Sequence, residues 1–355
     1  MKSMGEFVKY LGEGAYGSVD LVKYTLSDGS FSFFHAAVKG CCQMNHDSLK
    51  RELKILRELR GCPRIVKCFG DSLEEGLGYG NRKVYKLLLE YASEGSLRSF
   101  MDKYTDRKLP EPLIKDFTRM ILEGLVSVHG HGYVHCDLKS DNLLVFPSCG
   151  GDSYELKIAD FGISLDAGDI PDYWSIDSPF VGTPCYMPPE TVEDGVAKET
   201  LDLWSLGCLV LEMYTGERPW EGVDIDLLEA LLFDGNAPEI PESVPCDARE
   251  FIETCFSRYP EERGSAFKLW FHPFLRPEKE KQLIAVASPA VKKRDSLLLR
   301  IRGAWNKSTH ISKKPLKVKF FPTKAPKFKR ILNSLVRLKI MPMMKRSNSN
   351  LVSVQ

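Results

Sequence analysis

The stretch His135-Cys136-Asp137-Leu138-Lys139-Ser140-Asp141-Asn142-Leu143-Leu144, with Asp160-Phe161-Gly162 after it, decides how the chain is interpreted. Asp137 is a carboxylate that can orient an attacking hydroxyl group, and Lys139 is a cation close to it in the sequence. Asn142 and Asp160 carry oxygen atoms of the kind that Mg²⁺ prefers as ligands. Apolar residues flank the polar stretch on both sides, which is not typical of a chance surface loop. The stretch therefore predicts a catalytic loop with a metal site.

A glycine-rich stretch, Gly12-Glu13-Gly14-Ala15-Tyr16-Gly17-Ser18-Val19, lies between two strand-like runs near the start of the chain. Its three glycines let backbone N–H groups approach a phosphate without obstruction by a Cβ atom. The flanking strands predict a hairpin lid over phosphates rather than the strand-to-helix turn of a dinucleotide-binding fold. An ordinary glycine-rich hairpin is the alternative that this stretch alone leaves open.

Lys39 ends the run Ala36-Ala37-Val38, so an ammonium group stands in a strand that is otherwise apolar. Such a lysine either extends to solvent or anchors a phosphate, and the second role needs a counter-charge. Glu52 can supply that charge, because it shares the inward face of a predicted helix with leucine and isoleucine side chains. Glu58 is the rival carboxylate on the same helix, and we favour Glu52.

Length and composition are those of a globular protein. The chain has 355 residues, of which 43% are hydrophobic and 27% are charged, enough for one large domain or two small ones. No apolar run approaches the ~18 residues that a membrane-spanning helix needs, and the first residues do not resemble a signal peptide. We therefore expect a cytoplasmic protein whose ten cysteines are reduced, with neither disulfides nor a metal–thiolate site.

Charge is distributed unevenly along the chain. Residues 276–355 hold 21 of the 49 Lys and Arg residues and three of the 48 acidic residues, a net charge of +18. Residues 1–275 hold the remaining 28 basic and 45 acidic residues, a net charge of −17. This break predicts one domain over 4–275 and a basic, disordered tail over 276–355.

The predicted elements place strands before helices. Strands are predicted at 7–11, 18–22, 36–39 and 84–90, with a helix over 49–59 among them. Longer helices are predicted at 112–129, 202–213, 227–233 and 248–256. We expect an α+β, bilobal architecture with a small β-rich N-lobe over about 4–91 and a larger helical C-lobe over about 92–275.

In their order along the chain, these motifs resemble those of the eukaryotic protein kinase family over about residues 7–274. The resemblance identifies residues 12–19 as the glycine-rich loop, Lys39 as the phosphate-binding lysine and Glu52 as its helix partner. It extends to Met187-Pro188-Pro189-Glu190, a variant of the motif that closes the activation segment. It also covers Arg263, which pairs with that glutamate in the family. The fold implied is the bilobal protein kinase fold.

The same resemblance implies ATP and Mg²⁺ as cofactors and gives each site residue a role. Asp137 would orient the acceptor hydroxyl, and Lys139 would neutralise the transferred group. The metal ligands would be Asn142 and Asp160. The residues implied in ATP binding are Leu11, Gly12, Glu13, Gly14, Ala15, Tyr16, Gly17, Ser18, Val19, Ala37, Lys39, Glu90, Ala92 and Leu144. The hydroxyl residues of the activation segment are Ser164, Ser175, Ser178 and Thr183.

Two residues indicate which type of amino acid accepts the phosphoryl group. Lys139, two positions after Asp137, and Thr183 before a proline are similar to serine/threonine kinases rather than to tyrosine kinases. The segments 88–97, 134–139 and 182–187 look most like plant MAP kinase kinase kinases of the MEKK-like group. The resemblance therefore implies transfer of the ATP γ-phosphoryl group to Ser or Thr of a protein, with a MAP kinase kinase as the substrate.

Cys136 departs from the family's pattern, because most of these kinases have arginine at this position. In the family, that arginine ties the catalytic loop to a phosphorylated activation segment through bidentate hydrogen bonds, which cysteine cannot make. We therefore expect activity to depend only weakly on phosphorylation of the activation segment. Pro188 replaces an alanine in the closing motif, and its effect is not evident from the sequence.

Two other classes of function remain open from the sequence. A pseudokinase would have the kinase fold and bind other molecules without catalysing phosphoryl transfer. The residues whose loss usually marks a pseudokinase are all present here: Lys39, Asp137, Asn142 and Asp160. The tail could contact import receptors, anionic surfaces, calmodulin or a docking partner, or be a solvated extension. Its apolar residues recur at helical spacing among basic ones at Phe328, Ile331, Leu332 and Leu335. We expect no specific nucleic-acid partner, and nuclear localisation if the basic runs are import signals.

Overall fold

The structure is a computed structural model that describes residues 5–14, 17–25, 33–77, 83–148, 153–171 and 182–276. Ala15 and Tyr16 of the glycine-rich stretch lie outside the described residues, as do Ser175, Ser178 and the chain from 277 onward. Within the described ranges, no helix combines the length and the apolar character that a membrane span requires.

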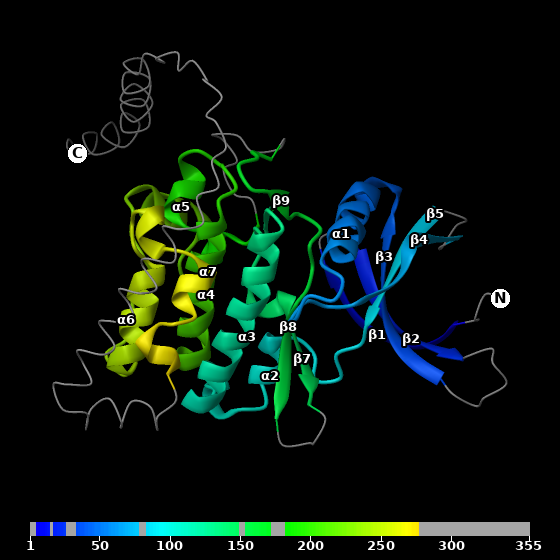
Figure 1. Ribbon diagram of the computed structural model, residues 1–355, viewed down its shortest axis with the longest axis horizontal. Coiled ribbons are helices and arrows are strands. Elements are labelled where there is room, and N and C mark those ends of the chain that lie inside the picture. The colour runs from blue at the N-terminus through cyan, green and yellow to red at the C-terminus, as the bar shows by residue number, and fades with distance from the viewer. Residues whose placement is uncertain are drawn as a thin grey trace, which may run out of the picture. The chain divides into compact units, whose positions relative to one another are not determined.

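A five-stranded antiparallel sheet forms the first part of the chain and is drawn in blue at the right of Figure 1. Its strands follow the order β1-β2-β3-β5-β4. They are β1 (Gly5–Gly14), β2 (Gly17–Thr25), β3 (Phe33–Cys42), β4 (Cys68–Leu77) and β5 (Lys83–Glu90). The short 3-10 helix η1 (Gln43–Asn45) and helix α1 (His46–Glu58) follow β3, and α1 packs on the sheet with Leu49, Ile55 and Leu56 buried.

The register of the sheet places the glycine-rich hairpin beside the strand that carries Lys39. Gly12 pairs with Val19, Val19 pairs with Lys39, and Lys39 pairs with Leu87. The turn into β2 depends on Gly17, whose φ is +148° and whose missing Cβ would lie 2.0 Å from the carbonyl oxygen of Gly40. Only glycine permits so close an approach of the two backbones.

Helices dominate the chain after Glu90 and lie on the left of Figure 1. They are α2 (Leu97–Met101), α3 (Glu111–Gly130), α4 (Glu199–Thr215), α5 (Ile225–Phe233), α6 (Cys246–Cys255) and α7 (Ala266–Leu269). The 3-10 helices are η3 (Thr105–Arg107), η4 (Ser140–Asn142), η5 (Pro184–Tyr186), η6 (Pro189–Val192), η7 (Pro260–Arg263) and η8 (Pro273–Leu275). Two small antiparallel pairs join β6 (Tyr133–Val134) to β9 (Leu165–Asp166) and β7 (Leu143–Pro147) to β8 (Tyr154–Ile158). The predicted α+β, bilobal architecture is confirmed.

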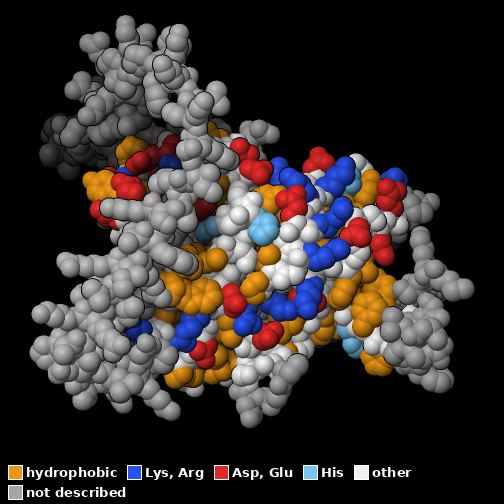
Figure 2. Space-filling model, in the orientation of Figure 1, with side chains coloured by type: hydrophobic (Ala, Val, Ile, Leu, Met, Phe, Trp, Pro, Cys, Tyr) orange, Lys and Arg blue, Asp and Glu red, His pale blue; other side chains and the backbone are white. Residues whose placement is uncertain are grey.

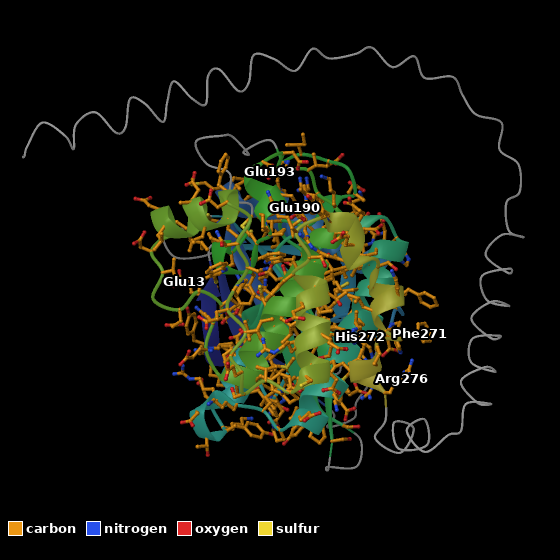
Figure 3. All side chains as sticks on the ribbon, turned by 90° about the vertical axis from the view of Figure 1, so that its left-hand side faces the viewer. Glu13, Glu190, Glu193, Phe271, His272 and Arg276 are labelled. Carbon is orange, nitrogen blue, oxygen red and sulfur yellow. The ribbon has the colours of Figure 1, made fainter. Side chains whose placement is uncertain are left out.

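Helix α4 lies at the centre of the helical lobe, where every residue from 202 to 213 is buried. A helix that is apolar on all sides must be covered on all sides, and the fully buried Trp204 packs here against Phe256. Arg263 is fully buried as well and donates hydrogen bonds of 2.5 and 2.9 Å to the two carboxylate oxygens of Glu190, which Figure 3 labels. The predicted pairing of Arg263 with the closing glutamate is thereby confirmed.

Candidate active site

Lys39 lies between two carboxylates supplied by different elements. Its Nζ is 2.7 Å from Oε2 of Glu52 on α1 and 2.8 Å from Oδ1 of Asp160, which follows β8. Glu52 is only 1% exposed. The other carboxylate of α1, Glu58, accepts a hydrogen bond from the hydroxyl of Tyr133 instead. The structure therefore pairs Lys39 with the carboxylate that the helical pattern favoured.

The two carboxylates hold the positive charge on Lys39. Burial alone would lower the pKa of Lys39, but Glu52 and Asp160 outweigh burial and raise it above its ordinary value. Burial also opposes the charge on Asp160, but the adjacent Lys39 outweighs it and lowers the pKa of Asp160. Lys39 and Asp160 are therefore both charged at neutral pH.

Asp137 is held by three side chains at the centre of the loop between β6 and β7. Its Oδ1 accepts a hydrogen bond of 2.7 Å from Oγ1 of Thr183. Nζ of Lys139 lies 2.8 Å from Oδ2 of Asp137 and donates to Oγ1 of Thr183 at 2.6 Å. Nδ2 of Asn142 donates to Oδ2 of Asp137 at 3.0 Å and to its backbone oxygen at 2.8 Å. Thr183, which the resemblance singled out together with Lys139, lies 46 residues along the chain from Asp137, and its contact with that carboxylate was not predicted from the sequence.

Gly182 lets Thr183 reach Asp137. Its φ is +112°, and a Cβ atom at this position would lie 2.5 Å from the backbone oxygen of Cys136 and 3.3 Å from Oδ1 of Asp137. Backbone atoms cannot move aside as a flexible side chain would. The close contact between the activation segment and the catalytic loop therefore requires glycine.

Asp160 is directed toward Lys39 by contacts on both sides of it in the chain. The rings of His135 and Phe161 are 5.0 Å apart, and the imidazole of His135 is hydrogen bonded to the backbone oxygen of Ala159 at 3.0 Å. On the other side, Oγ of Ser48 donates to the backbone oxygen of Gly162 at 3.1 Å. Sequence reasoning missed Ser48, although its spacing of four residues places it on the same helix face as Glu52.

The protein kinase domain family matches residues 6–275 of the chain. This chain belongs to the protein kinase family. It is 34% identical over 276 residues to mitogen-activated protein kinase kinase kinase 20 of Arabidopsis thaliana, a match that covers 76% of this chain and 78% of the relative.

Two further relatives are also protein kinases by name. Mitogen-activated protein kinase kinase kinase 3 of Arabidopsis thaliana is 35% identical over 277 residues, which cover 76% of this chain and 42% of the relative. Serine/threonine-protein kinase BCK1/SLK1/SSP31 of Saccharomyces cerevisiae is 32% identical over 295 residues, which cover 77% of this chain and 18% of the relative. The chain is a serine/threonine protein kinase, and its predicted resemblance to plant MAP kinase kinase kinases is confirmed.

The donor set of this kinase suits the Mg²⁺ that the family generally uses. The backbone N–H of Ala159 donates to the backbone oxygen of Asn142 at 2.9 Å, which brings Asn142 beside Asp160. Within the described residues, Oδ1 of Asn142 and Oδ2 of Asp160 take part in no hydrogen bond. The side chain of Asp160 is 35% exposed. These two free oxygen atoms are of the kind that Mg²⁺ prefers as ligands.

The segment that joins the two lobes, residues 90–92, is the hinge of the kinase, and it offers a free backbone donor at Ala92. The N–H of Glu90 donates to the backbone oxygen of Lys67 at 2.9 Å and is thus occupied. By contrast, no acceptor within the described part of the chain takes the N–H of Ala92, whose side chain is buried. Val19, Ala37 and Lys39 share one face of the sheet, because Val19 pairs with Lys39 and strand side chains alternate. The remaining apolar residues expected around adenine are Leu11 in β1 and Leu144 in β7, which forms a bridge with Ser96.

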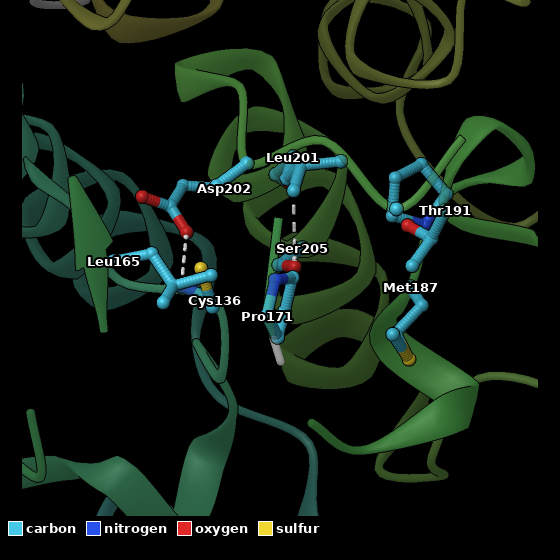
Figure 4. Close-up of a pocket in the computed structure, with 11 residues that line it drawn as sticks. Cys136, Leu165, Pro171, Met187, Thr191, Leu201, Asp202 and Ser205 are labelled. Atoms are coloured by element: carbon cyan, nitrogen blue, oxygen red, sulfur yellow. Dashed lines mark hydrogen bonds between the residues drawn. The ribbon is translucent and has the colours of Figure 1, made fainter. Parts of the chain in front are cut away.

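Cys136 contributes packing where most kinases have a cation. Figure 4 shows it below Asp202 and beside Leu165, in a cavity of about 20 Å³ that has room for one water molecule. Its Sγ donates a hydrogen bond of 3.5 Å to the backbone oxygen of Val134. Burial raises the pKa of Cys136 well above the ordinary value of a thiol. The side chain is therefore neutral and offers no site for a phosphate.

Ser164, one of the predicted hydroxyl residues of the activation segment, is buried in this structure. It is 1% exposed, and its hydroxyl donates a hydrogen bond of 3.0 Å to the backbone oxygen of His135. In this conformation Ser164 cannot receive a phosphoryl group, because no other kinase molecule can reach it. Its role is to attach the start of the activation segment to the catalytic loop.

Proposed function

We propose that this kinase acts as a MAP kinase kinase kinase and phosphorylates Ser or Thr residues of a MAP kinase kinase. The main support for this activity is that four predicted side chains lie close together in one site: Lys39, Asp137, Asn142 and Asp160. The printed names of the Arabidopsis relatives support the choice of substrate.

Positioning and neutralisation of charge account for the transfer. Phosphoryl transfer passes through a loose transition state with negative charge on the equatorial oxygens of the phosphoryl group. Lys39, held by Glu52, binds the phosphates of ATP, and Ala92 donates its free N–H to the adenine. Asn142 and Asp160 would hold Mg²⁺, which would supply further positive charge beside the phosphates.

Asp137 and Lys139 act on the acceptor side of the same step. As the bond between the γ-phosphorus and the bridging oxygen breaks, a bond forms to the acceptor hydroxyl oxygen, and the hydroxyl proton passes to Asp137. Lys139 balances the charge of the transferred group. Thr183 keeps Asp137 in place through its hydrogen bond to Oδ1.

A radiolabel transfer assay tests the proposal. The full chain is incubated with labelled ATP, Mg²⁺, a panel of purified MAP kinase kinases and unrelated acceptor proteins. We expect label on Ser or Thr of a MAP kinase kinase, and a loss of about 100-fold or more for Lys39→Met, since a charge aimed at the phosphates is removed. Lys9→Met is the matched control, because Lys9 is an exposed lysine of the same sheet.

Three results would contradict parts of this proposal. Wild-type rates for Lys39→Met would defeat the assignment of the phosphate-binding lysine. Transfer to unrelated acceptors but to no MAP kinase kinase would defeat the proposed substrate and leave the enzyme class intact. ATP binding by the wild-type chain without transfer to any acceptor would support the alternative of a pseudokinase.

A further inference from the structure

Helix α4 carries a carboxylate inside the helical lobe. Figure 2 shows acidic and basic side chains beside one another on the outer surface, where water solvates them. Glu212, by contrast, is 0% exposed. Burying a charged group is costly unless hydrogen bonds and an opposite charge compensate for the lost water. A fully buried glutamate therefore needs partners, and its partners show what it holds in place.

Three side chains from three different segments donate hydrogen bonds to Glu212. The hydroxyl of Ser140, in η4 of the catalytic loop, donates to Oε1 at 2.9 Å. The hydroxyl of Tyr186, in η5, donates to Oε2 at 2.6 Å. Nη1 of Arg98, in α2, donates to Oε1 at 3.1 Å and supplies the opposite charge. Ser140 and Tyr186 are also buried. We call Ser140, Tyr186 and Glu212 the α4 cluster.

The α4 cluster joins the two segments that also meet at Asp137. Ser140 directly follows Lys139 in the chain. Tyr186 belongs to the turn that begins at Thr183, because its N–H donates to the backbone oxygen of Thr183 at 3.0 Å. Lys139 and Thr183 are themselves in contact with the carboxylate of Asp137. The catalytic loop and the activation segment are therefore fixed to each other at two points, one at the catalytic centre and one at the α4 cluster.

Helix α4 holds the backbone of the activation segment as well. Oγ of Ser205 donates a hydrogen bond of 2.8 Å to the backbone oxygen of Tyr186. Glu212 lies seven residues after Ser205, about two helical turns, so the two residues share one side of the helix. The hydroxyl and the backbone of Tyr186 are thus attached to the same rigid element.

We propose that the α4 cluster positions Asp137 for phosphoryl transfer and connects the catalytic loop to the activation segment without a phosphate. Ser140 and Tyr186 are its positioning residues. The arginine that ties these two segments through a phosphate in the family is replaced here by Cys136. The α4 cluster makes a corresponding connection with two hydroxyl groups and a carboxylate that belong to the folded chain. This inference rests on the proposed role of Asp137 in the transfer.

Removal of single hydroxyl groups in the full chain tests the α4 cluster. Ser140→Ala and Tyr186→Phe each delete one donor to Glu212 and leave every charged group in place. A shift of about 1 Å in the reacting groups costs on the order of 100-fold in rate. The loss of one hydrogen bond among several allows a smaller shift, and we expect kcat to fall about ten-fold with the best acceptor protein of the panel.

Two further measurements show where the loss arises. The KM for ATP should stay within about two-fold of the wild-type value, because Lys39 and the hinge are unchanged. Rates are expressed per nucleotide-binding site, counted by titration with ATP, so that unfolded protein does not lower them. A loss confined to kcat per site indicates that the acceptor side of the reaction is out of position.

Two hydroxyl groups elsewhere in the helical lobe provide matched controls. Thr118 is 0% exposed, and its hydroxyl donates to the backbone oxygen of Ile114 within α3 at 2.7 Å. The hydroxyl of Tyr214 is buried and has no hydrogen-bond partner in the part of the chain that the structure describes. Thr118→Val and Tyr214→Phe remove buried hydroxyl groups without affecting Glu212. We expect both variants to keep the wild-type kcat per site.

A double variant and a phosphatase treatment test how the α4 cluster acts. The bonds from Ser140 and Tyr186 end on one carboxylate, so the loss in Ser140→Ala with Tyr186→Phe should be smaller than the product of the single losses. Phosphatase treatment should leave the ratio between wild type and Ser140→Ala unchanged, because the cluster contains no phosphate.

Four outcomes are incompatible with this role of the α4 cluster. They are wild-type kcat per site in both single variants, equal losses in the two controls, a double variant whose loss equals the product of the single losses, and a loss that disappears after phosphatase treatment. A wild-type chain that transfers phosphate to no acceptor would overturn the proposed function and this inference together. Variants as fast as an active wild type would overturn this inference alone.

Discussion

At the scale of single residues, backbone contacts explain how the catalytic loop accommodates a cysteine. The carboxylate of Asp202 accepts hydrogen bonds from the N–H groups of His135 and Cys136 at 2.9 and 3.1 Å. Cys136 has a φ of +66°, an uncommon conformation for a residue other than glycine. These contacts fix the loop whatever side chain stands at position 136. The side chain therefore affects what the loop binds more than how it folds.

The first residue-scale prediction concerns phosphorylation. Because the thiol of Cys136 cannot bind a phosphate, we expect phosphatase-treated protein to keep most of its kcat, within about three-fold, a change below ~1 kcal/mol. The measurement compares transfer rates before and after phosphatase, with mass spectrometry of the activation segment as the control for complete dephosphorylation. Loss of activity would instead assign phosphate binding to Lys50, Arg51 and Lys54 of α1, which line a cavity of about 440 Å³ with Ser164.

The sequence alone could identify site residues that stand out from a local pattern of apolar residues. Lys39 interrupts an apolar strand and Glu52 lies on an apolar helix face, so each was conspicuous. Ser48 was missed, and the contact of Thr183 with Asp137 was not predicted, because their partners lie 114 and 46 residues away in the chain. Long-range backbone geometry, such as the approach allowed by Gly182, leaves no local signal beyond the glycine itself.

At the scale of elements, the 3-10 helix η8 depends on a neutral histidine. Nδ1 of His272 accepts a hydrogen bond of 3.2 Å from the N–H of Phe274, and the imidazole packs against Phe251. Burial lowers the pKa of His272 below its ordinary value, against the opposing effect of Glu250 and Asp247. A protonated imidazole would lose the acceptor atom that caps η8.

This histidine predicts a dependence of stability on pH. The unfolded chain binds the proton of His272 more readily than the folded chain, so its contribution to the free energy of unfolding is complete above about pH 6.5 and decreases below it. His272→Asn keeps an acceptor oxygen but cannot gain a proton. Urea unfolding at pH 7.5 and pH 5.5 should show a larger loss of stability for the wild type than for the variant. Equal losses would contradict the prediction.

The predicted elements were present in every case, but the sequence placed their ends imperfectly. Helix α4 begins three residues before its predicted start at 202, and β3 extends beyond 36–39 at both ends. Strand β4 was not predicted, because its sequence CFGDSLEEGL contains two glycines and no β-branched residue. Pairing with β5 forms this strand despite its weak propensity, with an irregularity between Phe69 and Glu74.

At the scale of the whole molecule, an ion pair links the sheet to the helical lobe at the hinge. Nζ of Lys157 in β8 donates hydrogen bonds of 2.8 Å to both carboxylate oxygens of Glu90, at the end of β5. The two side chains are 11% and 15% exposed, and Oε1 of Glu90 also accepts the N–H of Lys67 at 2.7 Å. The hinge therefore has a fixed geometry next to the free N–H of Ala92.

Removing Lys157 should weaken this connection. Lys157→Met leaves a mostly buried carboxylate without its cation, and we expect the free energy of unfolding to fall by about 2 kcal/mol. The melting temperature should drop by ~5 °C, and the KM for ATP should rise as the hinge loosens. Adding Glu90→Gln to Lys157→Met should restore part of the stability, because the unpaired charge is then gone. No change in melting temperature or KM would argue against this role of the pair.

The requirement for glycine at position 182 has a practical meaning for genetics. We expect a methyl group there to separate Thr183 from Asp137 without altering the charged groups that we propose to bind nucleotide. Such an allele would retain a protein's capacity to assemble with others while silencing its chemistry. It would therefore distinguish phenotypes that depend on assembly from phenotypes that depend on phosphoryl transfer better than a replacement of Lys39 would.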